Sequence, residues 1–250
     1  MKLHLGLGTL HRLALSAAKR RQARILCDEP IVSFTFDDFP RSALDAGGRL
    51  LEEHGAHGTY YVSPALLNAS NHLGELFHVE DLHSLLLRGH ELGSHTFGHV
   101  SAKTLSPEDF WKNVEKGKEA IRTLTGVSPE DFAYPFGALT PRIKQHTHGV
   151  KSARSVIPGL NKRIFDLNLL RANSLYGDVD TVSHAVQMIA NNVRNRAWLI
   201  FYTHDVRQMP SPYGCTPALL DMVMQEALRS QSRLLSVQEA LALCEELPAG

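Results

Sequence analysis

The hydrophobic positions of the chain follow two alternating patterns. Short runs of β-branched and aromatic residues, such as 31–36 (IVSFTF) and 197–203 (AWLIFYT), are typical of buried strands. Between such runs, apolar residues recur every three or four positions, as in 79–88 (VEDLHSLLLR), which is typical of helices that bury one face. Strands that alternate with helices predict a parallel sheet covered by helices.

This alternation continues over most of the chain. Gly89 and Gly126 each follow a helical pattern, and a glycine just past a helix is a common terminator. Strands are expected within 31–40 and at 58–62, 90–95, 131–135, 150–156, 168–175, 197–205 and 233–236, and helices at 41–54, 79–88, 106–124, 140–148, 179–194, 217–230 and 237–247. Seven or eight strand–helix units in 250 residues predict an α/β fold, namely a (β/α) barrel with a complete or incomplete ring.

The first 26 residues differ from the rest. We expect an N-terminal extension over 1–26, with an amphipathic helix at 10–22 that packs on the domain or a partner, and one domain over 27–250. The apolar stretch of the extension is interrupted, and most of its basic residues follow it, which is the reverse of a signal peptide. No stretch is long and apolar enough to predict a transmembrane segment. We expect a cytoplasmic protein, with weak peripheral membrane contact as the alternative.

Composition excludes some classes of partner. Lys+Arg and Asp+Glu both number 26, and the resulting zero net charge argues against bulk binding of nucleic acid. The three cysteines, Cys27, Cys215 and Cys244, lie far apart and show no zinc-finger spacing. We expect free thiols, as is usual in a reducing compartment. The oligomeric state is left open.

Two adjacent carboxylates, Asp37 and Asp38, stand at the end of the first buried strand. In α/β folds, functional residues gather at the C-terminal ends of the strands. Neighbours on a strand point to opposite sides, so both acids serve one site only if the backbone turns there. The alternative is a strand-ending turn in which the aspartates cap backbone N–H groups.

His95 and His99 follow the third expected strand. Two imidazoles four residues apart lie on one face of a helix or a tight loop and can bind one metal ion. With Asp38 they form a set of two histidines and one carboxylate, which leaves metal positions open for water and substrate. A chance pair of histidines is the alternative for this segment.

Two further strand ends carry candidate residues. In 132–137 (FAYPFG), Pro135 and Gly137 mark a turn where the backbone can approach a ligand, or an ordinary strand-to-helix connection. His204 ends the strongest late strand and is either a structural residue or part of a site. In a barrel, all these strand ends meet at one rim.

The succession of TFDD, HTFGH, YPFG and a late strand-end histidine resembles the polysaccharide deacetylase family, that is, the NodB-homology domain of carbohydrate esterase family four. The resemblance covers residues from about 31 to the C-terminal helix. It implies a distorted (β/α)7–8 barrel over 27–250 and metal-dependent removal of N-acetyl groups from sugars. It also implies roles: Asp37 as general base, His204 as general acid, the Phe136 N–H as oxyanion donor, and Asp38, His95 and His99 as metal ligands, usually to zinc.

The chain departs from the family pattern at two places. Ala133 stands where the family has an arginine that pairs with the base, and we expect Arg171 to replace that arginine. The acid that would orient His204 is indistinct, with Asp178 and Asp180 as candidates that could equally cap a helix. The loop after His204 either brings Tyr213 to stack on a sugar ring or is an ordinary surface loop with a helix cap at Thr216. Substrate contacts are also expected from Pro135 and Gly137.

These observations predict a hydrolase of carbon–nitrogen bonds other than peptide bonds, a sugar N-deacetylase with one divalent ion. Zinc is the expected ion, with cobalt, nickel or manganese as alternatives. The expected partner is an N-acetylated sugar or oligosaccharide, with a soluble or lipid-linked glycan precursor favoured over a mature cell wall. An O-acetyl esterase or other amide hydrolase on the same barrel, and a catalytically weak glycan-binding protein, are the competing hypotheses.

Overall fold

The main sheet of the molecule is parallel throughout and strongly curled. The computed structural model describes residues 11–248. Seven strands follow one another in the order β10-β11-β2-β3-β6-β7-β8, and β12 also pairs with β2. Their bounds are β2 Ile31–Asp37, β3 Thr59–Val62, β6 Glu91–Ser94, β7 Asp131–Ala133, β8 Ser152–Arg154, β10 Asn173–Ser174, β11 Trp198–Thr203 and β12 Arg233–Leu234.

An isolated bridge brings the two edges of this sheet together. Leu170 precedes the edge strand β10, and its carbonyl accepts a hydrogen bond from the Ser155 N–H (2.8 Å), just past the other edge strand, β8. The Leu170 N–H in turn donates to the Ala153 carbonyl (2.9 Å). Irregular backbone hydrogen bonds of this kind, rather than a pair of strands, therefore close the ring among the described residues, and the predicted distorted barrel is confirmed.

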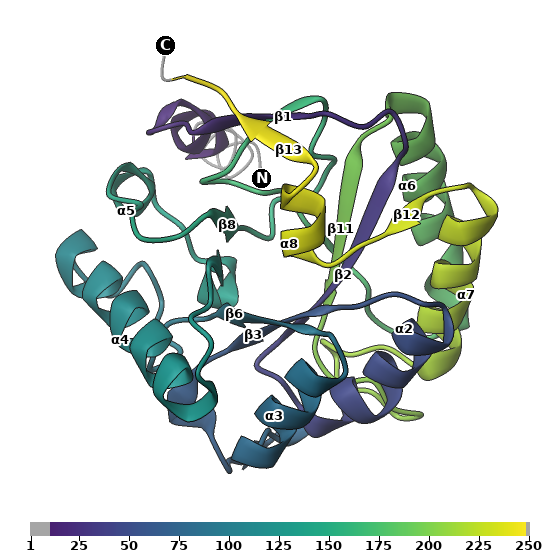
Figure 1. Cartoon of the computed structure of the whole chain (residues 1–250), viewed down its shortest axis with the longest axis horizontal. Coiled ribbons are helices and arrows are strands. Elements are labelled where there is room, and N and C mark those ends of the chain that lie inside the picture. The colour runs from purple at the N-terminus through teal and green to yellow at the C-terminus, as the bar shows by residue number, and fades with distance from the viewer. Residues whose placement is uncertain (1–10, 249–250) are drawn as a thin grey trace, which may run out of the picture.

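Helices cover the outside of the strands (Figure 1). Side-chain caps begin two of these helices: the Ser106 hydroxyl accepts from the Asp109 N–H (3.1 Å), and the Thr216 hydroxyl accepts from the Leu219 N–H (3.2 Å). The helices are α2 Arg49–Glu53, which continues a π-helical turn at Ala43–Gly48, then α3 Val79–Leu87, α4 Pro107–Thr125, α5 Pro141–Gln145, α6 Val182–Asn195, α7 Pro217–Arg229 and α8 Val237–Leu241. Short 3-10 turns lie at Pro64–Leu66, Pro135–Gly137 and Val179–Thr181, and a small hairpin is formed by β4 Ser70–Asn71 and β5 Gly74–Glu75.

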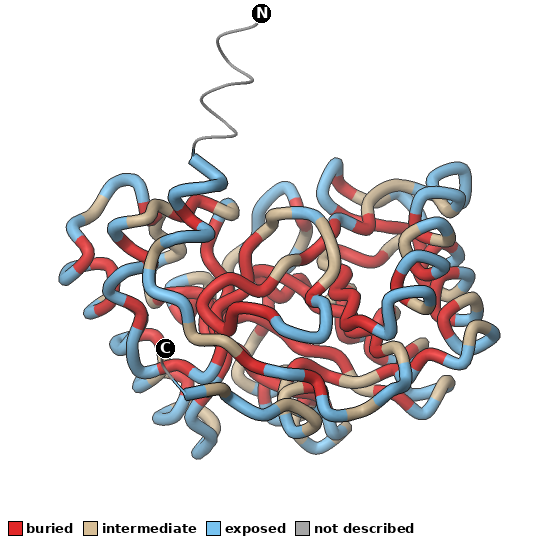
Figure 2. Tube along the Cα trace, turned by 90° about the horizontal axis from the view of Figure 1, so that it is seen from above, coloured by how far each residue is buried: buried red, intermediate tan, exposed pale blue. Residues whose placement is uncertain are grey.

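The core lies on both faces of the curled sheet. All seven residues of β2 are buried, because one face points into the barrel and the other against helices. Figure 2 shows buried segments running through the middle of the molecule and exposed segments at its periphery. Trp111 and Trp198 are among the largest fully buried side chains.

A second, antiparallel sheet was absent from the sequence predictions. Its order is β13-β1-β9, with β1 at Gln22–Ile25, β9 at Ile164–Asp166 and β13 at Cys244–Glu246. The predicted closing helix 237–247 is wrong beyond Leu241, because the chain then pairs with β1, where Ile25 lies opposite Cys244. The strands predicted at 150–156 and 168–175 are also shorter in the structure.

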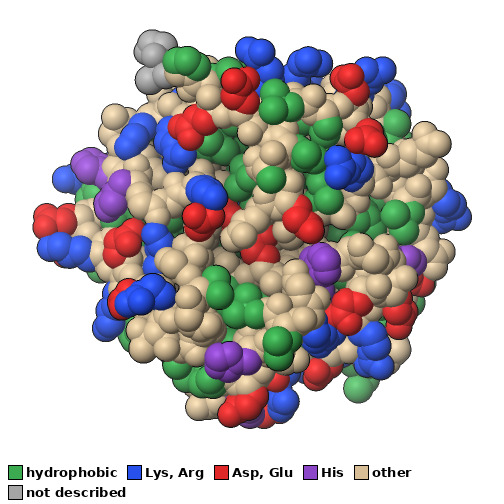
Figure 3. Space-filling model, viewed as in Figure 1, with side chains coloured by type: hydrophobic (Ala, Val, Ile, Leu, Met, Phe, Trp, Pro, Cys, Tyr) green, Lys and Arg blue, Asp and Glu red, His purple; other side chains and the backbone are tan. Residues whose placement is uncertain are grey.

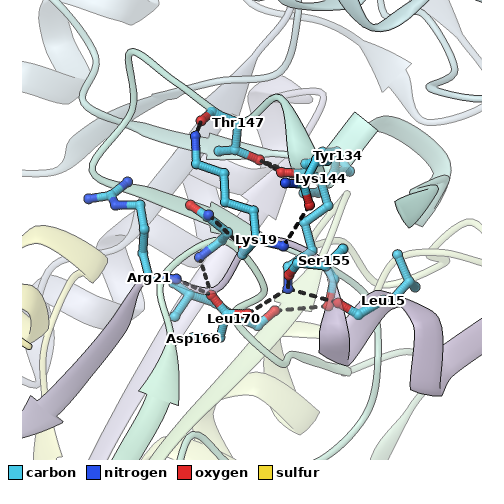
Figure 4. Close-up of polar contacts among 12 residues, drawn as sticks. Leu15, Lys19, Arg21, Tyr134, Lys144, Thr147, Ser155, Asp166 and Leu170 are labelled. Carbon is cyan, nitrogen blue, oxygen red and sulfur yellow. Dashed lines mark hydrogen bonds and ion pairs between the residues drawn. The ribbon is translucent and has the colours of Figure 1, made fainter. Parts of the chain in front are cut away.

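The N-terminal helix packs on the barrel; residue 10, where the predicted helix begins, lies outside the described part of the chain. Residues 11–17 are helical, and the buried Leu15 joins an apolar cluster of the domain. The buried ammonium group of Lys144 donates to the carbonyls of Leu15 (2.8 Å) and Ala18 (2.7 Å), and to Asp166 Oδ2 (2.6 Å), as Figure 4 shows. The predicted helix ends early because Gln22 begins β1.

The surface carries both signs of charge. On the face seen in Figure 3, acidic and basic side chains are interspersed rather than gathered by sign. This distribution fits the balanced composition of the chain. Within residues 11–248, every helix is too short or too polar to cross a membrane.

Candidate metal centre and active site

The backbone turns sharply where the two adjacent aspartates lie. Asp37 is the last residue of β2, whereas Asp38 and Phe39 adopt left-handed conformations with φ of 60° and 47°. Such conformations are uncommon for residues with a side chain and are often retained at functional sites. The turn satisfies the condition under which both carboxylates serve one site, and both are buried.

Asp38, His95 and His99 lie close enough together to bind one metal ion. One potential ligand atom from each residue lies within 4.8 Å of the other two. Asp38 Oδ1 is 3.1 Å from His99 Nε2 and 3.7 Å from His95 Nε2. His95 Nδ1 is 2.8 Å from the Ala133 carbonyl, so this nitrogen carries the proton and Nε2 presents its lone pair toward Asp38.

The segment between the two histidines is a tight loop rather than a helix. Thr96 and His99 have φ of 64° and 51°, and the Asn113 side chain of α4 accepts from the N–H of Phe97 (2.9 Å). A Cβ on Gly117 of α4 would lie 2.8 Å from the Thr96 carbonyl carbon, so only glycine allows this approach. Helix α4 therefore fixes the direction in which His99 points.

The chemistry of this trio fits a divalent cation. Burial raises the pKa of Asp38 to about 6, and Asp38 Oδ1 is buried without a hydrogen-bond partner in the described part of the chain. Burial also lowers the pKa of His95 to about 3 and lowers that of His99, so both imidazoles are neutral at pH 7. Two neutral imidazoles and an unpaired carboxylate oxygen form a ligand set that a cation would complete.

Asp37 is held by an arginine from the other side of the barrel. Arg154, the last residue of β8, is buried and donates from Nη2 to Asp37 Oδ1. Its guanidinium carbon lies 4.9 Å from the ring centre of Tyr61 and 5.1 Å from that of Tyr202. Burial would raise the pKa of Asp37, but Arg154, together with the nearby histidines, brings it below its ordinary value. Asp37 is therefore a carboxylate at neutral pH.

Arg171 does not take this role, and the prediction that it replaces the missing arginine is wrong. Its Nη1 donates to the Pro158 carbonyl (3.0 Å), and its backbone N–H donates to Asn161 Oδ1 (2.9 Å). It lines a separate cavity of about 540 Å³, to which Ser16 and Asn191 also contribute. The prediction failed because position 171 falls before the short strand β10, whereas β8 carries Arg154 to the rim.

His204 lies at the rim, directly after the end of β11. Its Nδ1 is 3.1 Å from the Tyr213 carbonyl, which orients the ring. Asp178 does not orient it: its Oδ1 accepts from the Val179 N–H (2.6 Å) and from Thr216 Oγ1 (2.7 Å). Asp180 lies exposed in the 3-10 turn that follows Asp178.

The predicted substrate-contacting residues divide into rim and interior. Phe136 is 69% exposed, and its ring centre lies 4.4 Å from that of His99. Tyr213 is 49% exposed and lies 5.8 Å from the ring of His204. Gly137 has φ 59°, where a Cβ would lie 2.0 Å from Val156 Cγ2, and Pro135 is buried, so these two residues shape the turn that presents Phe136.

Sequence reasoning missed several residues of this rim. Of these residues, Arg154 had the clearest signal in the sequence. It lies inside a run predicted to be a buried strand, and a buried arginine needs a counter-charge. Tyr176 and Tyr202 lie near the same arginine, with ring centres 5.6 Å apart. His72, on the β4–β5 hairpin, gave no local signal, and its ring lies 5.9 Å from that of Tyr213.

Comparison with known proteins gives a consistent result. A family model described as polysaccharide deacetylase matches residues 27–152. The chain is 24% identical over 215 residues to an Arthroderma benhamiae protein named "Probable peptidoglycan-N-acetylglucosamine deacetylase", covering 84% of this chain and 44% of that one. It is 26% identical over 211 residues to a chitin deacetylase of Colletotrichum lindemuthianum, covering 82% and 78%.

A solved structure shares the fold. It is a family 4 acetyl xylan esterase from Clostridium thermocellum in complex with a cobalt ion, with a TM-score of 0.59 and 19% identity, covering 85% of this chain and 91% of that one. The chain spans less than half the length of the first curated relatives that it matches.

Proposed function

The chain belongs to the polysaccharide deacetylase family, and from this premise we propose that it is a metal-dependent hydrolase that removes N-acetyl groups from the amino sugars of a glycan or glycan precursor. One observation carries the proposal: the Asp38–His95–His99 trio lies next to a carboxylate, Asp37, that its partner Arg154 keeps ionised. A metal-ligand set beside a base is the arrangement that metal-assisted amide hydrolysis requires.

Each residue then has a defined task. A divalent ion at the trio, with zinc as our first choice, supplies Lewis acidity that activates water and polarises the amide carbonyl. Asp37 accepts the proton of the attacking water, because its lowered pKa keeps it ionised. His204 donates a proton to the departing amine, which would otherwise leave as an unstable anion.

The developing oxyanion needs a donor that is already in place. Phe136 has φ 59° at the turn beside His99, and we assign its N–H this role. The exposed rings of Phe136 and Tyr213 lie at the rim and are suited to contact the faces of sugar rings. These two residues would orient the N-acetyl group toward the trio.

The test combines metal analysis with product analysis. The protein is stripped with a chelator, reloaded separately with zinc, cobalt, nickel or manganese, and assayed for acetate release from N-acetylglucosamine oligomers and polymer. We expect about one ion per chain, as a single three-ligand site predicts. Both metal and acetate release should disappear in His95→Ala. The matched control is His54→Ala, whose imidazole pairs with Asp221 Oδ1 (2.8 Å) away from the site.

The outcomes separate the competing functions. Acetate release from O-acetylated sugars without release from N-acetylated ones would assign an esterase. Stoichiometric metal without hydrolysis of any acetylated sugar would support a glycan-binding protein. A wild-type protein that binds no ion would refute the metal-dependent mechanism.

A further inference from the structure

The loop after β11 is built around a carboxylate that the reaction does not use. Asp205 follows His204 and is fully buried. Its Oδ1 accepts from Ser211 Oγ (2.5 Å), and its Oδ2 accepts from the Ser211 N–H (2.8 Å) and lies 2.8 Å from Arg207 Nε. A buried carboxylate with this many partners fixes the shape of the segment that contains it.

That segment carries the group which orients His204. The Tyr213 carbonyl is 3.1 Å from His204 Nδ1 and accepts the His204 backbone N–H at the same distance. Next to it, a Cβ on Gly214 would lie 2.4 Å from Asp205 Oδ1, so the carboxylate packs directly against the backbone at this point. The position of the Tyr213 carbonyl therefore depends on Asp205.

Arg207 ties the same loop to the other side of the rim. Its Nη2 donates to the His72 carbonyl (3.2 Å) on the β4–β5 hairpin, and its backbone N–H donates to the Cys215 carbonyl (3.2 Å). The His72 ring in turn meets the Tyr213 ring edge-on at 5.9 Å. Tyr213 is thus held between the hairpin and the Asp205 cluster.

We propose that Asp205 is a positioning residue for His204: it fixes the Tyr213 carbonyl, which holds the His204 proton on Nδ1 and leaves Nε2 facing the rim as the proton-exchanging atom. A backbone carbonyl accepts only from a protonated ring nitrogen, so the tautomer follows from the loop geometry. The catalytic consequence rests on the proposed function, whereas the tautomer does not. Among the described residues, the partner of His204 Nδ1 is this backbone carbonyl and not a carboxylate.

The first test uses two substrates that differ in their need for an acid. An N-acetyl amine must be protonated as its C–N bond breaks, whereas the phenolate of 4-nitrophenyl acetate leaves without a proton. In zinc-loaded Asp205→Asn we expect kcat on an N-acetylated oligosaccharide to fall about 10- to 100-fold with little change in KM, within the range of one acid–base group. Hydrolysis of 4-nitrophenyl acetate should change less than about 2-fold.

Two further variants guard this test. Ser211→Ala removes the hydroxyl that donates to Asp205 and accepts the Tyr213 N–H (3.2 Å), so it should show the same selective loss to a smaller degree. Asp178→Asn is the matched control, because Asp178 bonds Thr216 near the same loop but not His204. Equal losses on both substrates in Asp205→Asn and Ser211→Ala would make Asp205 a purely structural residue and overturn the proposal.

The second test needs no activity. In ¹⁵N-imidazole NMR spectra at alkaline pH, with His204 assigned by its absence in His204→Gln, we expect the Nδ1–H tautomer in the wild-type protein. A mixture of tautomers is expected in Asp205→Asn. If the wild type hydrolyses neither substrate, the proposed function fails and this spectrum still decides the inference. The same tautomer in both proteins would overturn it.

Discussion

Within residues 11–248, the buried ion pairs Lys144–Asp166 and Arg154–Asp37 are built in opposite ways. Under the N-terminal helix, the Lys144 ammonium has three oxygen acceptors, and Asp166 Oδ1 accepts the N–H groups of Arg21 (3.1 Å) and Asn168 (3.0 Å) (Figure 4). In the active site, Asp37 is held by Arg154, whose Nε lacks a hydrogen-bond partner among the described residues.

Burial alone does not show whether an ion pair has a structural or a functional role, whereas its hydrogen bonds do. Both pairs carry the desolvation cost of charge, but only the Lys144 pair uses its full hydrogen-bonding capacity within the protein. Arg154 is instead held by the faces of Tyr61 and Tyr202, which position it without consuming its N–H groups. An ion pair whose N–H donors are all hydrogen-bonded fixes the structure around it. An ion pair with a free N–H donor can form a new hydrogen bond when the charge at the reacting centre changes.

Replacing Lys144 tests the structural side of this comparison and has the largest expected effect. Lys144→Met leaves Asp166 without its cation and removes the donor to the carbonyls of Leu15 and Ala18. We expect a loss of about 3–5 kcal/mol in the free energy of unfolding, measured by urea denaturation. Metal content and kcat should remain those of the wild type.

The surface pair of Lys112 and Glu108 provides the control, because Lys112→Met removes an exposed cation and should change stability little. If Lys144→Met lost activity but not stability, the Lys144–Asp166 pair would not have the purely structural role that we assign to it.

Replacing Arg154 tests the functional side. Arg154→Lys keeps the charge beside Asp37 but loses the planar group that lies between two tyrosine rings. We expect kcat for acetate release to fall about 10- to 100-fold, which corresponds to about 1.4–2.7 kcal/mol in the barrier. Metal content should not change. Arg171→Ala is the control and should be unaffected, since Arg171 bonds Pro158 instead. A loss confined to Arg171→Ala would restore the original prediction.

A third buried group, Asp131, sharpens the comparison because it forms no ion pair with the described residues and Lys151 acts on it only from a distance. Asp131, at the start of β7, accepts from Ser152 Oγ (2.6 Å), and burial raises its pKa to about 6. The neighbouring Glu91 also has its pKa raised by burial and by Asp131. An acid whose pKa is higher in the folded state favours folding at low pH, and this contribution is lost as the pH rises through about 6.

Asp131→Asn should therefore be more stable than the wild type at pH 7.5, by about 2 kcal/mol, and the difference should shrink toward pH 4. Urea unfolding of the metal-free proteins at both pH values measures this difference. A stability difference that does not depend on pH would show that Asp131 is not the titrating group.

The sequence predicted the positions of the site residues more accurately than it predicted the residues that support them. Asp37, Asp38, His95, His99 and His204 stand at or just past the ends of predicted strands, and the barrel brings all five to one rim. Arg154 belongs to a three-residue strand whose partner on the far side of the ring is distant in the chain. Pattern and spacing do not specify which strand of a barrel will face a given carboxylate.

By itself, the sequence determined the alternation of strands and helices, and the residue types that stand at the strand ends. Both properties follow from local side-chain periodicity, which acts over a few residues. Only the tertiary structure decided that Arg154 pairs with Asp37, that the Tyr213 carbonyl orients His204, and that Cys244–Glu246 is a strand. Each of these depends on a partner from a separate segment, and the free energy of such contacts appears only when the folded chain brings the segments together.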